Sequence, residues 1–120
     1  MTQVLIVEDN EMNRDMLGRR LIRKGYEIIY ALNGEEAIEK AKSKPDIILM
    51  DLSLPIMTGW DAIKLLRTME STSNIPIIAI TAHALSGEME TAFEAGCNDY
   101  LTKPIEFDLL LEKMEALLKK

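Results

Sequence analysis

The chain has 120 residues, of which 48% are hydrophobic and 28% are charged. This composition is ordinary for one soluble globular domain and unlike a disordered or fibrous protein. The formal net charge of −6 argues against nucleic-acid binding, because affinity for DNA comes largely from Lys and Arg that neutralise phosphates. We therefore expect a single domain over residues 1–120, with no output domain.

At the N-terminus we expect neither a signal peptide nor a membrane span. Met1 is soon followed by a short apolar run that ends at Glu8, which is too short for either role. The single cysteine, Cys97, cannot form an internal disulfide, and we interpret it as a small apolar residue in a turn. These features lead us to expect a cytoplasmic protein.

Five short apolar runs alternate with longer segments of helical spacing, a pattern typical of βαβ units around a parallel sheet. The predicted strands cover residues 3–7, 27–31, 46–50, 77–81 and 99–102. The predicted helices cover residues 12–24, 34–42, 59–69, 86–95 and 107–119. The second and fifth strands are less apolar than the others, which suggests that they lie nearer the edges of the sheet.

Helix ends and one apolar stripe support this assignment. Gly25 and Gly96 follow the first and fourth helices, where a left-handed residue commonly ends a helix. The last helix has apolar residues at the i, i+3, i+4, i+7 spacing of a core-facing stripe. The members of this stripe are Phe107, Leu110, Leu111, Met114, Leu117 and Leu118. Right-handed crossovers and short loops then favour an α/β, flavodoxin-like doubly wound sheet in the order 2-1-3-4-5, with helices on both faces.

Acidic side chains follow two of the predicted strands. Glu8 and Asp9 come directly after the first apolar run, and Asp51 comes directly after the third. In the predicted order these strands are neighbours, so the three carboxylates meet where the winding direction switches, which is the ligand position in such sheets. Crowded carboxylates repel one another, and a hard divalent cation relieves that repulsion. We predict a Mg²⁺ site, with Mn²⁺ as an alternative, of the open kind that also binds phosphate.

Two further residues complete a phosphoryl pocket, because Thr81 closes the fourth strand and Lys103 follows the fifth. In chain order, the full set is Glu8 and Asp9, Asp51, Thr81, and Lys103-Pro104. This set resembles the receiver domain of two-component response regulators, and the resemblance covers essentially the whole chain. It implies that Asp51 takes a phosphoryl group from a phosphohistidine on another protein. Lys103 and Thr81 would contact phosphoryl oxygens, and a cis bond before Pro104 would aim the lysine inward.

The same resemblance implies a ligand set for the metal. Asp9, Asp51 and the backbone carbonyl of Ser53 would hold Mg²⁺. Glu8 would act through water or as an outer-shell acid.

A conformational switch is also implied by the resemblance. The Thr81 hydroxyl would move to the phosphoryl group, and the Tyr100 ring would rotate inward to fill the space. This movement would repack the surface of the fourth helix, fifth strand and fifth helix. Ser53 and His83, each two residues after a site residue, would flank the path of an attacking water and influence the lifetime of the phosphate.

The implied partners are a histidine kinase or histidine phosphotransfer protein and a downstream protein target, with no nucleic acid and no membrane. The donor is external, because the only histidine, His83, would lie at the rim of the pocket. A histidine-bearing four-helix bundle would dock near Met12, Met16 and Ile105. Core packing is the competing interpretation, and for Met16 we favour it. We expect a monomer or a weak phosphorylation-dependent dimer.

Other interpretations compete with this one. A magnesium-dependent phosphohydrolase would need a second aspartate two residues after the nucleophile, where Ser53 stands. A pseudo-receiver would lack part of the acidic set, Thr81 or Lys103. An excised receiver of a hybrid kinase is the third alternative. The segments that look similar to such receivers are 81–84, 95–97 and 103–105. We favour a stand-alone signalling protein that catalyses only its own phosphorylation and dephosphorylation.

Overall fold

The computed structural model describes residues 1–54, 56–82 and 88–119. Its strands are β1 (Gln3–Val7), β2 (Glu27–Ala31), β3 (Ile47–Asp51), β4 (Ile77–Thr81) and β5 (Asp99–Thr102). Its helices are α1 (Glu11–Arg23), α2 (Gly34–Ala41), α3 (Gly59–Thr68), α4 (Glu88–Ala95) and α5 (Phe107–Leu118). The predicted boundaries agree with these to within one residue, apart from the predicted start of the fourth helix at 86, which lies outside the described residues.

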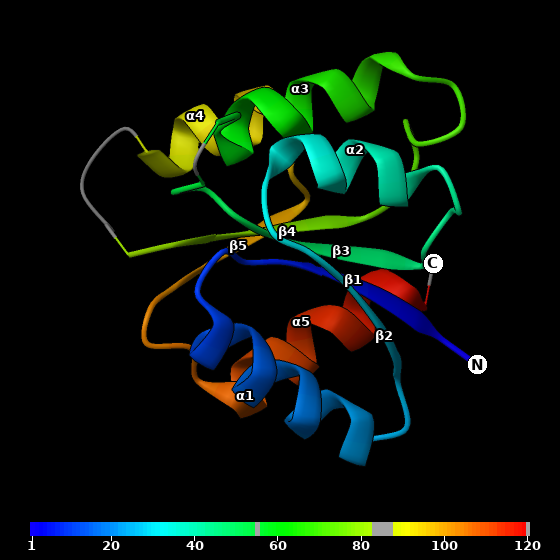
Figure 1. The fold of residues 1–120 in the computed structure, drawn as a ribbon, viewed down its shortest axis with the longest axis vertical. Helices are drawn as coiled ribbons and strands as arrows, with labels where there is room; N and C mark the ends of the chain where they lie inside the picture. Colours follow the sequence, from blue (N-terminus) through cyan, green and yellow to red (C-terminus); the bar gives the residue numbers. More distant parts are fainter. Residues whose placement is uncertain (55, 83–87, 120) are drawn as a thin grey trace.

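The strands form one parallel sheet in the order β2-β1-β3-β4-β5. Helices α1 and α5 cover one face of this sheet, and α2, α3 and α4 cover the other (Figure 1). The predicted class, strand order and edge positions of β2 and β5 are therefore confirmed. In the described part of the chain, no helix combines the length and the apolar character needed to cross a bilayer.

The burial of each strand agrees with its position in the sheet. Every residue of β3 and β4 is buried, which is typical of central strands in a sheet covered on both faces. Along β1, Leu5 and Val7 pack into the core under α2 and α3, whereas Val4 and Ile6 pack into the core under α1 and α5. This alternation follows from the two-residue period of a strand.

The two helices on one face of the sheet, α1 and α5, bury different sets of residues. In α5, Leu110 and Met114 are fully buried, and the rest of the predicted stripe packs around them. In α1, Leu17 and Leu21 face the same core. Met16 is 56% exposed, so our preference for core packing of Met16 was wrong. Leu17 and Leu21, which follow Met16 on the helix, point at the sheet instead.

Local capping chemistry sets where the helices begin and end. The side chains of Asn10, Asn33 and Thr58 accept hydrogen bonds from the first turns of α1, α2 and α3, as N-cap residues do. Gly25 and Gly96 have φ of 96° and 123°, which confirms the left-handed helix ends. Because all five strands are parallel, their carboxyl ends, and the loops that follow them, lie at one edge of the sheet.

Candidate functional site

The carboxyl ends of β1 and β3 bring three acidic side chains together. Val7 pairs with Met50 in the β1–β3 register, so the residues that follow each lie side by side. One carboxylate oxygen from each of Glu8, Asp9 and Asp51 lies within 4.8 Å of the others. Glu8 and Asp51 are only 7% and 3% exposed, whereas Asp9 is exposed. Asp51 is the last residue of β3 instead of the first residue after it, because it continues the ladder to Ile80 of β4.

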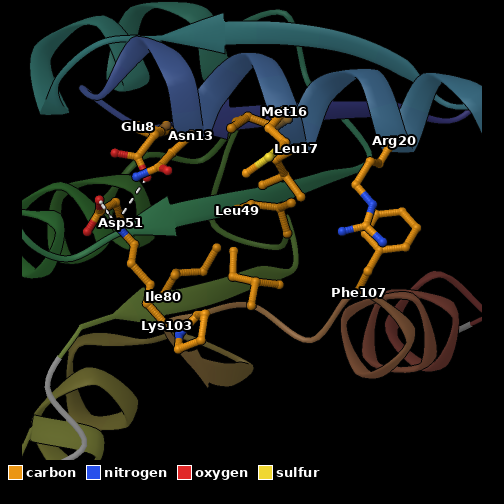
Figure 2. Close-up of a pocket in the computed structure, with 14 residues that line it drawn as sticks. Glu8, Asn13, Met16, Leu17, Arg20, Leu49, Asp51, Ile80, Lys103 and Phe107 are labelled. Carbon is orange, nitrogen blue, oxygen red and sulfur yellow. Dashed lines mark hydrogen bonds and ion pairs between the residues drawn. The ribbon is translucent and has the colours of Figure 1, made fainter.

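Lys103 lies between two of these carboxylates (Figure 2). Its Nζ is 2.8 Å from Oδ2 of Asp51 and 3.1 Å from Oε1 of Glu8. The Lys103 backbone N–H donates to the Thr81 carbonyl at 2.8 Å, which holds the residue at the end of β5. The peptide bond between Lys103 and Pro104 is cis. Residues far apart in the sequence thus form one ionic cluster.

Backbone donors orient the two buried carboxylates. The Ser53 N–H donates to Oδ1 of Asp51 at 2.9 Å, so each Asp51 oxygen has its own partner. The Asn10 N–H donates to Oε2 of Glu8 at 3.1 Å. Arg14, on the first turn of α1, donates to the Glu8 carbonyl at 3.0 Å. We did not predict the Arg14 contact, although its position at the start of the first helix made it available to the preceding loop.

Burial, together with the charges and hydrogen bonds of the cluster, shifts two pKa values. Burial raises the pKa of the Glu8 carboxyl, and the nearby Asp51 charge adds to this, although the Asn10 N–H and Lys103 oppose it. Burial alone would lower the pKa of Lys103, but its hydrogen bonds to Asp51 and Glu8 outweigh that effect and raise it. Lys103 is therefore cationic at neutral pH and offsets only part of the negative charge of three carboxylates.

The chemistry of this donor set fits a divalent metal. Three carboxylates offer hard oxygen ligands close together, and their charge exceeds what one lysine compensates. Mg²⁺ is usually held by one or two carboxylates and keeps several waters, so a partly exposed cluster of this kind suits it. The exposed Asp9 leaves one side of the cluster open to solvent.

The expected switch residues lie on β4 and β5, the last two strands of the sheet. Thr81 ends β4 and is 2% exposed, and it pairs with Thr102 in β5. Tyr100 is half-buried on β5. Its ring meets Phe93 of α4 edge to face, with the ring centroids 6.1 Å apart. His83, expected to affect phosphate lifetime, lies outside the described residues.

A cavity of about 480 Å³ adjoins the cluster, between α1 and the segment that leads into α5 (Figure 2). Asp51, Glu8 and Lys103 line one end. At the other end Arg20 of α1 lies over the Phe107 ring, 4.4 Å from its centroid. Sequence reasoning missed this pair, because no short-range pattern links residues on the first and last helices.

Comparison with known families decides the identity of this site. Residues 4–115 match the response regulator receiver domain family. The chain belongs to this family. The chain is thus a receiver domain of two-component or phosphorelay signalling.

Two kinds of relative share this receiver sequence. The chain is 47% identical over 108 residues to hybrid signal transduction histidine kinase G of Dictyostelium discoideum, a match that covers 87% of the chain. It spans only 3% of that kinase, and 7% of kinase I of the same organism. It is also 39% identical over 116 residues to the polar-differentiation response regulator DivK of Brucella anthropi, covering 96% of the chain and 94% of DivK.

Solved receiver structures share the fold. The receiver domain of sensor histidine kinase PA1611 from Pseudomonas aeruginosa is 35% identical, with a TM-score of 0.92 over 99% of this chain and 98% of that one. That structure has a magnesium ion coordinated in its active-site cleft. The receiver of Saccharomyces cerevisiae Ssk1, crystallised with the phosphotransfer protein Ypd1, is 36% identical, with a TM-score of 0.86 over 93% of this chain and 85% of that one.

Proposed function

We propose that Asp51 is the phosphoacceptor of this receiver. The observation that carries the proposal is the setting of its carboxylate, which is almost completely buried at the sheet edge. One oxygen contacts the Lys103 ammonium and the other accepts from the Ser53 N–H. A carboxylate held in this way presents a fixed nucleophile to an incoming phosphoryl group.

The proposed reaction is transfer from a phosphohistidine of another protein. An Asp51 oxygen forms the new O–P bond while the N–P bond of the donor breaks, and its electron pair returns to the imidazole nitrogen. Phosphoryl transfer asks the protein mainly for positioning and charge balance. Lys103 would supply a cation to one phosphoryl oxygen, and Thr81 would donate its hydroxyl to another.

We assign Asp9, Asp51 and the Ser53 carbonyl as the residues that would hold Mg²⁺, with Glu8 acting through water or from the outer shell. Bound Mg²⁺ neutralises charge that develops on the phosphoryl oxygens. The carboxylate cluster and the magnesium ion in the PA1611 receiver support this assignment.

We propose that Thr81 and Tyr100 pass the phosphorylation signal to the α4–β5–α5 surface. The contact between Tyr100 and Phe93 supports this, because rotation of the Tyr100 ring would remove a packing partner from α4. Ser53 and His83 are proposed to influence how long the phosphate lasts. The module signals by switching its own state instead of turning over a substrate.

The partner we propose is a histidine kinase or a histidine phosphotransfer protein, with a downstream protein as target. The chain would act as a single domain, either alone, as the length of DivK suggests, or within a larger hybrid kinase. The presence of Ypd1 in the Ssk1 structure supports a phosphotransfer protein as one class of donor.

Intact mass after incubation with acetyl phosphate and Mg²⁺ tests the phosphoacceptor. We expect the parent chain to gain one phosphoryl group, and Asp51→Asn to gain none. Asp61→Asn is the matched control, because Asp61 is an exposed acid in the first turn of α3. A gain that persists in Asp51→Asn would place the phosphate elsewhere. A folded parent chain that gains nothing, beside a control receiver that does, would overturn the proposal.

A further inference from the structure

The three acids of the cluster are not held equally. The carboxylates of Glu8 and Asp51 each accept a backbone N–H and each contact the Lys103 ammonium. The Asp9 carboxylate is exposed, and among the described residues no hydrogen bond or ion pair reaches it. Its direction therefore depends on how the backbone of its own loop is held.

Arg14 holds that backbone from α1. Its Nη1 donates to the Glu8 carbonyl at 3.0 Å and to the Asp9 carbonyl at 3.4 Å. One group on a helix thereby binds two consecutive peptide units of the loop. On the other side, the Glu8 N–H donates to the Ala31 carbonyl of β2 at 3.1 Å. The loop that carries the two acids is thus fixed between α1 and β2.

The Arg14 guanidinium serves these carbonyls and not a carboxylate. The residue is half-buried, and within the described part of the chain it forms no ion pair. A guanidinium is planar and its donors are rigidly arranged, so its hydrogen bonds fix direction as well as distance. The contact therefore restrains the peptide unit of Asp9 more than a solvated surface charge would.

We infer that Arg14 is a positioning residue for the metal site, which keeps the Asp9 carboxylate beside those of Glu8 and Asp51 by holding the loop backbone. This inference rests on the proposed assignment of the metal ligands. Mg²⁺ demands near-ideal octahedral geometry, so a ligand that moves costs affinity. In this role Arg14 touches neither the ion nor the phosphoryl group, and acts only through Asp9.

Positioning and charge predict opposite effects when Arg14 is removed. Arg14 is a cation close to the cluster, so its charge alone repels Mg²⁺, and loss of that charge would tighten Mg²⁺ binding. Loss of a restraint on Asp9 would instead weaken Mg²⁺ binding. Arg14→Met removes both the charge and the hydrogen bonds, whereas Arg14→Lys keeps the charge but replaces the rigid fork by a flexible point charge.

The test is a calorimetric titration of the metal-free protein with Mg²⁺ alone, well below the melting temperature of each variant. We expect Arg14→Met to weaken Mg²⁺ binding by about tenfold, the lower end of the cost of losing a hydrogen-bond partner that orients a metal ligand. Arg14→Lys should restore part of this and bind about threefold more weakly than the parent. Arg19→Met is the matched control and should keep the parent affinity, because Arg19 is an exposed cation of α1 paired with Asp15.

A double-mutant cycle with Asp9→Asn separates positioning from general damage to the fold. Asp9→Asn should itself weaken Mg²⁺ binding. When Arg14→Met is added to Asp9→Asn, the affinity should change little further, because the carboxylate that Arg14 positions is already gone. A purely structural role for Arg14 would lower the affinity by the same factor in both backgrounds.

Several results would overturn the inference and leave the proposed phosphoacceptor intact. They are equal or tighter Mg²⁺ binding in Arg14→Met, an equal fall in Arg19→Met, and an undiminished effect of Arg14→Met in the Asp9→Asn background. If Arg14→Met fails to fold, Arg14→Lys decides, and parent affinity in that variant would overturn the inference. A parent chain that binds no Mg²⁺ would instead overturn the metal assignment, and the inference with it.

Discussion

At the scale of single residues, Lys103 is the cation on which the site depends. It contacts the two buried carboxylates, Asp51 and Glu8, at 2.8 and 3.1 Å. Each of those carboxylates also accepts one backbone N–H. Removal of the lysine would therefore leave the carboxylates oriented but without their charge partner, and would open the cluster to other cations.

Lys103→Met, which keeps the length of the side chain, tests this. We expect the free energy of unfolding to fall by about 1–3 kcal/mol, because two buried acceptors lose a charged donor. Mg²⁺ should bind more tightly once the competing ammonium is gone, while phosphorylation by acetyl phosphate slows by at least about tenfold. Mg²⁺ titration, urea unfolding and intact mass measure the three effects. Lys42→Met is the control, since Lys42 forms an ion pair with exposed Glu39, away from the cluster. Weaker Mg²⁺ binding in Lys103→Met would contradict the competition.

Cys97 provides a test of burial at the opposite end of the sheet. Burial raises the pKa of its thiol from the usual 9.0 to about 11. The folded protein holds this proton more tightly than the unfolded chain, so the stability from Cys97 is present below pH 9 and lost as pH rises through about 11. Cys97→Ala should flatten the fall in unfolding free energy across that range.

The Cys97 thiol of the folded protein should also resist a thiol reagent at pH 8 until urea is added, and rapid labelling would contradict its burial.

At the scale of elements, Arg67 ties four of them together at the edge of the sheet remote from the site. Its guanidinium, at the end of α3, donates to the Gly96 carbonyl at 2.9 Å and to Oδ1 of Asn98 at 2.9 Å, just before β5. It also donates to the Ser73 carbonyl at 3.1 Å, in the segment before β4. Asn98 Oδ1 accepts in turn from the Ile77 N–H at 2.8 Å. These polar contacts act there beside the apolar packing of Ile75, Ile77 and Cys97, which are buried in the core.

Arg67→Met should lower the free energy of unfolding by about 1–3 kcal/mol, because partly buried carbonyls lose their donor. Phosphorylation by acetyl phosphate per folded molecule should be unchanged, since the network lies at the other edge of the sheet. Urea titration gives the stability and intact mass gives the activity. Arg23→Met, at an exposed position on α1, is the control and should change neither. Equal stability of the two variants would show that the Arg67 contacts contribute little.

At the scale of the whole molecule, the sequence allowed the strand order to be predicted, because apolar runs and helical spacing are local patterns that topology rules convert into few arrangements. The meeting of Glu8, Asp9 and Asp51 followed from that order. The Lys103 contacts and the Arg20–Phe107 pair were not predictable in detail, because they depend on how distant loops pack. The exposure of Met16 was mispredicted because helical period alone does not say which face meets the sheet.

The left-handed conformation of Ile56 had no sequence signal at all, because isoleucine is among the residues least suited to positive φ. Local propensity and global structure disagree in this loop, which follows the residue proposed to carry the chemistry. Such disagreement is expected at functional positions, where a protein retains strain that the rest of the fold must stabilise.

The coupling of the acidic cluster to the stability of the whole domain can be measured directly. An ion that binds only the folded protein stabilises it by RT ln(1 + [L]/Kd), or about 2.7 kcal/mol at one hundred times Kd. We expect Mg²⁺ to raise the melting temperature by several degrees in a concentration-dependent way, because the repelling carboxylates exist as a cluster only after folding.

Asp9→Asn should abolish most of this rise while leaving the Lys103 contacts in place, since Lys103 pairs with the other two acids. Asp15→Asn, which removes an exposed pair with Arg19 on α1, should keep the full rise. Equal loss in both variants would mean that Mg²⁺ acts by general screening and not at the sheet edge.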